Sequence, residues 1–151
     1  MSIKVEVCND QSVWDDEVVT RGGHPLQLWG WGEVKAAHGW RVERVFIYSD
    51  DSVIGAAQIL LRRLPWPLKY LAYIPRGPVA DTVDREVVLD SVVSHVKLAY
   101  GAAVVTIEPD WDEMPTNTSW KRSSNTILIP RTLILDLEQT EDDLLSHMSK
   151  K

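Results

Sequence analysis

A short apolar run near residue 105 limits the folds that this sequence can adopt. Residues 102–107 (AAVVTI) are small or β-branched and none is charged, so neither face of such a strand suits water. The residues before it, from about 84 to 100, carry apolar side chains at helical spacing: Val88, Val92, Val96 and Ala99. A helix that leads into such a strand predicts a sheet strand buried from both sides, with helices packed on the sheet.

The rest of the chain also alternates between helical and strand periodicity. Ahead of that helix we expect a strand at 3–8, helices at 10–21 and 27–39, a hairpin of strands at 40–48 and 53–64, and a strand at 69–74. Downstream we expect a strand at 132–137 (TLILDL) and a helix that begins with Thr140 and Asp143 as a capping box. Prolines at 65 and 67 end the hairpin.

This order predicts an α/β (α+β) protein with a mixed, mostly antiparallel sheet flanked by helices on both faces. It is the order found in the acyl-CoA N-acyltransferase-like (GNAT-like) fold, which the chain resembles. We expect a GNAT-like domain over residues 1–137. Residues 138–151 are expected to begin a helix that leads into a second, absent domain, because that helix reaches Lys151 after about two turns without a stop signal.

Composition excludes several classes of protein. The 151 residues include 16 Lys+Arg and 22 Asp+Glu, and the net charge of −6 opposes attraction to a polyphosphate backbone. A single cysteine, Cys8, cannot form an internal disulfide. No apolar run approaches the roughly 18 residues that a membrane span requires, and no signal peptide is evident. We therefore expect a cytoplasmic protein.

Common catalytic and metal motifs are missing. The four histidines are scattered, no G-x-S-x-G occurs, and no H-x-x-x-H or C-x-x-C array predicts a metal site. A GNAT enzyme holds the CoA pyrophosphate with backbone N–H groups in a glycine-rich loop before a helix. Here that loop reads IPRGPVADTVD, and Pro75 and Pro78 have no N–H to donate. We expect no cofactor, and no CoA in particular.

The segment QLWGWGEVK (27–35) places a lysine on an apolar helical face. Residues 27, 31 and 35 follow at i, i+4 and i+8, so Lys35 shares a face with Trp31. Its ammonium either extends to water along the indole or points into a groove that binds an anion.

Four segments together resemble the FemABX family, the non-ribosomal peptidyltransferases that build peptidoglycan interpeptide bridges: QLWGWGEVK, YIPRGPVAD, VVTIEPDW and PRTLILDLEQTEDDLLSHMSKK. The resemblance implies two GNAT-like domains that transfer an amino acid from aminoacyl-tRNA to a stem-peptide amine of a cell-wall precursor. This chain is similar to the first domain. The implied partners are UDP-muramyl pentapeptide or its lipid-linked form, and aminoacyl-tRNA mainly through the second domain. Peripheral contact with the membrane is compatible with a lipid-linked substrate.

The resemblance also assigns site residues. Lys35 and Trp31 match the helix whose lysine contacts the diphosphate of the precursor. Glu108, in TIEP, matches an acidic residue usually written as Asp before Pro, and we assign it the catalytic carboxylate. Tyr73, Arg76 and Gly77 match a Y-x-x-R/K-G-P segment that binds substrate.

Each of these residues also has a purely structural interpretation. Glu108 can cap the loop beside Pro109, and Arg76 can close a tight turn instead of meeting phosphate. Gly77 is expected to supply a turn conformation that Pro78 then fixes.

Two other functions remain open at this point. One is a small GNAT acetyltransferase that uses acetyl-CoA. The other is a non-catalytic module that binds a wall precursor.

Overall fold

The protein is described here from a computed structural model, which defines residues 2–114, 120–124, 127–129 and 138–147. The chain divides into two units, Met1–Trp120 and Lys121–Lys151, which are treated separately. Unit 1 contains, in order, β1 (Ile3–Val7), α1 (Gln11–Thr20), a 3-10 turn η1 (Pro25–Gln27), α2 (Trp29–Ala37), β2 (Arg41–Ser49), β3 (Ser52–Arg63), β4 (Tyr70–Pro75), β5 (Val79–Ala80), a 3-10 turn η2 (Thr82–Asp84), α3 (Arg85–Tyr100) and β6 (Ala102–Glu108). Unit 2 contains α4 (Glu141–His147).

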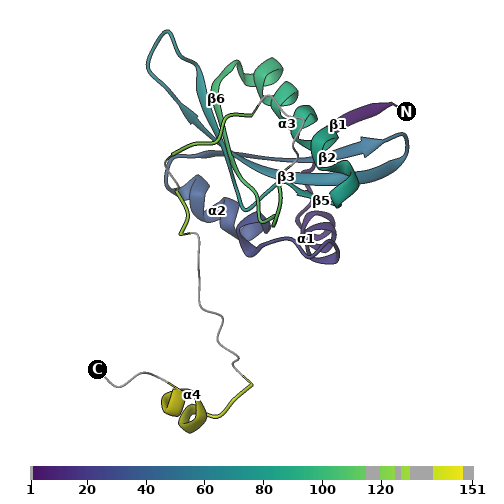
Figure 1. The fold of residues 1–151 in the computed structure, drawn as a ribbon. Coiled ribbons are helices and arrows are strands. Elements are labelled where there is room, and N and C mark those ends of the chain that lie inside the picture. Colours follow the sequence, from purple (N-terminus) through teal and green to yellow (C-terminus); the bar gives the residue numbers. More distant parts are fainter. Residues whose placement is uncertain (1, 115–119, 125–126, 130–137, 148–151) are drawn as a thin grey trace. The chain divides into compact units, whose positions relative to one another are not determined.

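One twisted sheet organises unit 1 (Figure 1). Its strand order is β1-β2-β3-β4-β6, and the short β5 pairs with β3. All pairings are antiparallel except β4 with β6, which are joined by the crossover helix α3 and run parallel. The predicted mixed, mostly antiparallel sheet is confirmed.

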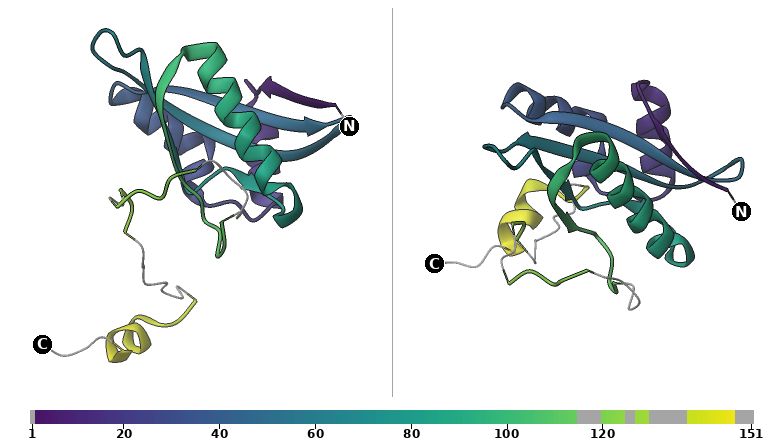
Figure 2. Two further views of the ribbon diagram at one scale, coloured as in Figure 1. Left: turned by 45° about the horizontal axis from the view of Figure 1, so that its top comes forward. Right: turned by 90° about the horizontal axis from the view of Figure 1, so that it is seen from above.

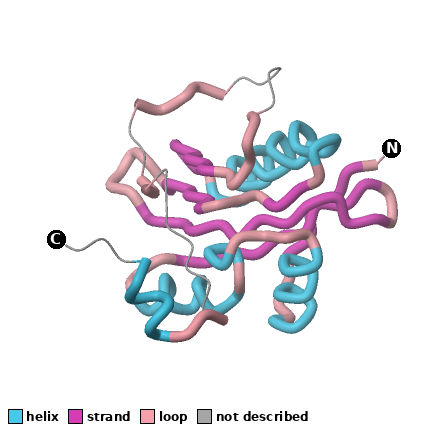
Figure 3. The backbone as a smooth tube through the Cα atoms, turned by 60° about the horizontal axis from the view of Figure 1, so that its bottom comes forward, coloured by secondary structure: helices cyan, strands magenta, loops and turns pink. Residues whose placement is uncertain are grey.

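Helices cover both faces of this sheet, with α1 and α2 on one side and α3 on the other (Figures 2 and 3). Because side chains alternate along β2, Val45 and Ile47 join the core under α3, whereas Phe46 joins the core under α1. Trp14 of α1 is fully buried and stacks on Phe46 with ring centroids 5.2 Å apart. The sheet is therefore the shared wall of two separate apolar cores.

Most predicted boundaries are confirmed by local capping. Asp10 caps α1 by accepting a hydrogen bond from the Val13 N–H at 3.1 Å. Gly101 ends α3 in the left-handed region, with φ of +61°. In unit 2, the Asp143 N–H donates to the Thr140 hydroxyl at 3.3 Å at the start of α4, as the capping box predicts.

The second helix begins later than its periodicity suggests. Gln27 lies in η1, not in α2, and the helix starts at Trp29 with Leu28 as its N-cap. Tertiary contacts cause this difference, because the fully buried Gln27 side chain hydrogen-bonds to backbone groups of β3 and β4. Gln27 therefore does not share a helical face with Lys35.

The prediction that residues 102–107 are buried from both sides is wrong for part of β6. Val105 and Ile107 pack against the core under α3, but Val104 is 46% exposed. Among the described strands, β6 is the last in the sheet and pairs with β4 alone. The predicted strand at 132–137 lies outside the described residues. None of the described helices is long and apolar enough to cross a membrane.

Candidate functional site

Two predicted site residues meet at the carboxyl ends of the parallel strands. Tyr73 of β4 and Glu108, the last residue of β6, come together because Pro75 and Glu108 are paired in the parallel register. The Tyr73 hydroxyl donates a hydrogen bond of 2.6 Å to Glu108 Oε2. Only the parallel crossover through α3 brings these residues, 35 positions apart, side by side.

The environment of Tyr73 keeps its hydroxyl protonated. Burial, followed by the hydrogen bond to Glu108 and the charge of that carboxylate, raises the pKa of Tyr73 well above its usual value, against the opposing effect of Arg76. A phenol in this state is a fixed donor. It therefore holds one oxygen of the Glu108 carboxylate in a defined direction.

A tight turn after β4 places Arg76 beside this pair. Arg76 has a positive φ of +50° and donates through Nη1 to Asp110 Oδ1 at 3.1 Å. The left-handed residue of the turn is thus Arg76 and not Gly77, which corrects the sequence-based expectation. A non-glycine residue in this region costs energy, and such outliers gather where surrounding contacts hold them in place.

Gly77 is required by close packing instead. A Cβ on Gly77 would lie 2.5 Å from Gln27 Cδ. Gln27 cannot retreat, because its Nε2 donates to the Pro75 carbonyl at 2.6 Å and its Oε1 accepts from the Gln58 N–H at 2.8 Å. The turn that carries Arg76 is therefore anchored by a buried amide from η1.

This amide belongs to a larger buried network that joins η1 and α2 to the sheet. Gln58 Nε2 donates to the carbonyls of Leu26 and Leu28, both at 3.1 Å. Its Oε1 accepts from Arg44 Nε at 2.8 Å, and the Arg44 guanidinium lies over the Trp29 ring at 3.6 Å. The sequence analysis missed Gln27, Gln58 and Arg44, since polar residues at these positions carry no local signal. The fully buried state of both glutamines is what identifies them.

His24 is a further residue near the turn that the sequence analysis left unassigned. Its Nδ1 accepts a hydrogen bond from the Leu26 N–H at 3.1 Å, which leaves Nε2 as the protonated nitrogen of a neutral ring. Burial lowers the pKa of His24; the charge of Asp110 opposes this shift and that of Arg76 adds to it. His24 therefore lies within electrostatic reach of the Arg76–Asp110 pair.

Lys35 and Trp31 lie on α2 and contact each other. The Lys35 ammonium is 4.6 Å from the centroid of the Trp31 ring, and both side chains are partly buried. Trp31 Nε1 is buried without a hydrogen-bond partner among the described residues. The start of α2 adjoins the Arg76 turn through Gln27, and Lys35 lies about 10 Å further along the helix axis. Its contact with substrate stays a prediction.

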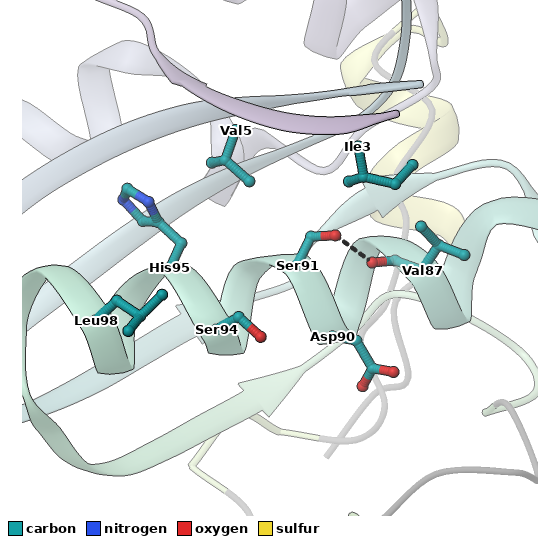
Figure 4. A pocket seen from close by; sticks show the side chains of 8 residues that line it. All are labelled: Ile3, Val5, Val87, Asp90, Ser91, Ser94, His95 and Leu98. Carbon is teal, nitrogen blue, oxygen red and sulfur yellow. Dashed lines mark hydrogen bonds between the residues drawn. The ribbon is translucent and has the colours of Figure 1, made fainter. Parts of the chain in front are cut away.

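A separate groove lies between α3 and β1, on the face opposite α2 (Figure 4). It has a volume of about 490 Å³, and none of the predicted site residues lines it. The His95 ring points into it and is held by Glu43 Oε2 at 2.8 Å. In the described part of the chain, no three His, Cys, Asp or Glu side chains lie together as a metal site would need.

The arrangement suits proton transfer and anion binding. Glu108 supplies a carboxylate that can accept a proton, and Tyr73 fixes its direction. Arg76 adds a positive charge at the edge of the same site.

Comparison with known proteins relates this chain to one family of transferases. The FemAB family profile matches residues 17–131. The lipid II:glycine glycyltransferase of Staphylococcus aureus is 30% identical over 148 residues, with 85% of this chain and 35% of the relative covered. The enzyme of the same name from Staphylococcus saprophyticus is 34% identical over 91 residues, covering 58% of this chain and 22% of the relative. This chain thus spans about a third or less of the length of these curated relatives.

Solved structures give the fold. The crystal structure of FemX superposes with a TM-score of 0.61 at 29% identity, covering 74% of this chain and 28% of FemX. An aminoglycoside 6'-N-acetyltransferase from Acinetobacter haemolyticus, at 9% identity, gives a TM-score of 0.51 over 87% of this chain and 99% of its own. The fold is therefore GNAT-like, as its element order predicts, and this chain belongs to the FemAB family.

Proposed function

We propose that this chain is the first part of an aminoacyltransferase that extends the stem peptide of a peptidoglycan precursor in the cytoplasm. The observation that carries the proposal is the Tyr73–Glu108 pair at the ends of two parallel strands, beside Arg76, in a chain of the FemAB family. Relatives named lipid II:glycine glycyltransferases support the substrate class. The product would serve cell-wall synthesis and hence cell shape.

The proposed reaction uses the carboxylate as a base. Glu108 accepts a proton from the stem-peptide amine as its nitrogen forms a bond to the carbonyl carbon of the aminoacyl ester. The ester C–O bond breaks, and the tRNA ribose oxygen takes up the proton that Glu108 received, which restores the carboxylate. Tyr73 holds the carboxylate in place. The tRNA is bound mainly by parts of the protein that this chain does not include.

We further propose that no CoA takes part. Pro75 ends β4, and Pro78 lies in the segment between β4 and α3. That segment also forms β5, which pairs with Gly55 and Ala56 of β3. The first turn of α3 carries Glu86, two residues after the N-cap Asp84, with Arg85 between them. Two carboxylates against one cation leave this helix N-terminus with a net negative charge, which disfavours a pyrophosphate where an acetyltransferase would attract it.

Substrate binding is tested by calorimetric titration of the chain with UDP-muramyl pentapeptide. Lys35→Met keeps the hydrophobic stem over Trp31 but removes the charge, so we expect at least tenfold weaker binding, about 1.5 kcal/mol or more. Lys4→Met, at an exposed lysine of β1, serves as the matched control. No binding of the precursor, or equal loss in both variants, would refute the proposed role of Lys35.

A test of the role of Glu108 requires an assay of the transfer reaction itself. In a protein that contains this chain and its partner domain, Glu108→Gln should lower kcat for transfer from aminoacyl-tRNA by about 100-fold or more and leave precursor affinity almost unchanged. A variant with wild-type kcat would show that Glu108 only closes the loop beside Pro109.

A further inference from the structure

The β3–β4 hairpin, residues 62–69, exposes a large apolar surface at its tip. Trp66 is 92% exposed and Leu68 is 50% exposed, and Pro65 and Pro67 beside Trp66 are exposed as well. The Leu64 N–H donates to the Lys69 carbonyl at 3.0 Å and closes the loop. Figures 1 and 2 show this teal hairpin projecting beyond the end of the sheet.

The same hairpin is a local concentration of positive charge. Arg62, Arg63 and Lys69 are exposed, and no Asp or Glu occurs between Asp51 and Asp81 in the sequence. The chain as a whole has a net charge of −6. This hairpin therefore attracts anions although the protein as a whole repels them.

A second indole lies at the base of the hairpin. The Arg62 guanidinium is 5.3 Å from the centroid of the Trp40 ring, and Trp40 directly precedes β2. The projecting tip thus has an apolar end, formed by Trp66 and Leu68, and a cationic, aromatic base.

We propose that this hairpin docks on an anionic membrane surface, with Trp66 and Leu68 inserted among the lipid headgroups and the three basic side chains near the phosphates. Tryptophan is favoured at the boundary between hydrocarbon and water, because its ring is apolar and its N–H is polar. Each basic side chain near an anionic surface strengthens binding about fivefold. Single-stranded RNA is the less suitable ligand, since Leu68 offers no ring for a base to stack on.

This contact would also orient the candidate site. The hairpin precedes β4, whereas Tyr73 and Glu108 lie toward its far end, so at 3.3 Å per residue the site is about 20 Å from the hairpin tip. Lys35 lies at the end of α2 that leads to Trp40, and therefore at the hairpin end of the sheet. If the proposed function holds, a lipid-linked precursor would place its diphosphate near the membrane and its amine at Glu108.

Vesicle binding tests the proposal without any transfer reaction. In co-sedimentation with equimolar phosphatidylcholine and phosphatidylglycerol, we expect at least tenfold stronger binding than with phosphatidylcholine alone, and a loss at high salt. Trp66→Ala should weaken binding at least tenfold. Brominated lipid chains should quench part of the tryptophan emission of the wild type, and Trp66→Ala should remove that part.

Two exposed positions away from the hairpin provide matched controls. The first is Val83, which is 88% exposed and precedes the start of α3. The hairpin residue Lys69 packs beside Gly101 at the opposite end of this 16-residue helix, so Val83 is far from the hairpin. Val83→Ala should therefore leave vesicle binding unchanged. Lys69→Glu in the hairpin should weaken binding about tenfold. The second control, Lys4→Glu on β1, makes the same change of charge and should have little effect.

Two outcomes would overturn the proposal. One is that the wild type does not bind the anionic vesicles, or that the hairpin variants bind them as the wild type does. The other is that the hairpin variants lose affinity for a single-stranded RNA oligonucleotide while vesicle binding is unaffected. Precursor binding by the chain in the absence of vesicles tests the proposed function separately, so either idea can fail alone.

Discussion

Gly77 has no room for a side chain, and this makes its substitution a sharp test of the site. In Gly77→Ala, the new Cβ would lie 2.5 Å from the Gln27 amide, which two hydrogen bonds hold in place. We expect unfolding by urea to show a loss of about 2 to 3 kcal/mol. Gly30→Ala is the control, since nothing lies within 4 Å of its Cβ and α2 favours alanine; its stability should be unchanged or slightly higher.

Arg76 is the opposite case, because a residue with a long side chain adopts a backbone conformation that favours glycine. Arg76→Gly should relieve the positive φ and remove the contact with Asp110. Because the relief of about 1 kcal/mol and the exposed ion pair are of similar size, we expect a change in stability of under 1 kcal/mol. Precursor affinity, measured by calorimetry, should nevertheless fall if the guanidinium binds substrate. Unchanged affinity would assign Arg76 to closing the turn.

At the scale of elements, the Gln27 side chain connects η1 to β3 and β4. Gln27→Leu preserves volume but leaves the Pro75 carbonyl and the Gln58 N–H without their partner in a buried position. We expect a loss of about 3 kcal/mol in the free energy of unfolding. Gln11→Leu, at the exposed start of α1, should change stability by less than about 0.5 kcal/mol. Equal effects of the two substitutions would argue against the network.

The contact between β2 and α3 should depend on pH through Glu43. Burial alone raises the pKa of Glu43, but hydrogen bonds from His95 and Tyr100, together with the charges of His95 and Arg41, lower it below its ordinary value of 4.5. A carboxyl with a lowered pKa contributes stability above its unfolded value, and this contribution is lost as the pH falls through the folded value.

Glu43→Gln should therefore be about 2 kcal/mol less stable than the wild type at pH 7. The difference should shrink as the pH falls below about 4.5, in urea titrations made at a series of pH values. Asp16→Asn, at an exposed position of α1, should show no such dependence on pH. A difference that stays constant from pH 7 to pH 3 would contradict the assignment.

Local periodicity was enough to predict the five longer strands of unit 1, most of its helix caps and the mixed sheet, because those features depend on residues close in sequence. Predictions from local periodicity were wrong where a contact between residues far apart in sequence determines the structure. Gln27 sits on the helical stripe of QLWGWGEVK, yet its bonds to β3 and β4 hold it outside α2. The apolar run of β6 gave no indication that Val104 faces solvent. The resemblance to a family indicated Tyr73 and Glu108, but their hydrogen bond follows from the parallel register alone.

For the molecule as a whole, ligands that bind only the folded state should raise its unfolding temperature. UDP-muramyl pentapeptide at 100 times its dissociation constant should add about 2.7 kcal/mol to the free energy of unfolding. Millimolar CoA should leave the midpoint of thermal unfolding unchanged. A shift with CoA alone would favour an acetyltransferase over the function proposed here.

The two cores on opposite faces of the sheet also imply an order of assembly during synthesis. Among the residues that the structure describes, the core that contains Trp14, Phe46 and Val79 uses none beyond position 79, whereas the core under α3 needs Val88, Val92 and Ala102. A nascent chain of about 80 residues can therefore close one face of its sheet while the other face is still bare. Until α3 and β6 leave the ribosome, that bare face is where a chaperone would have to bind.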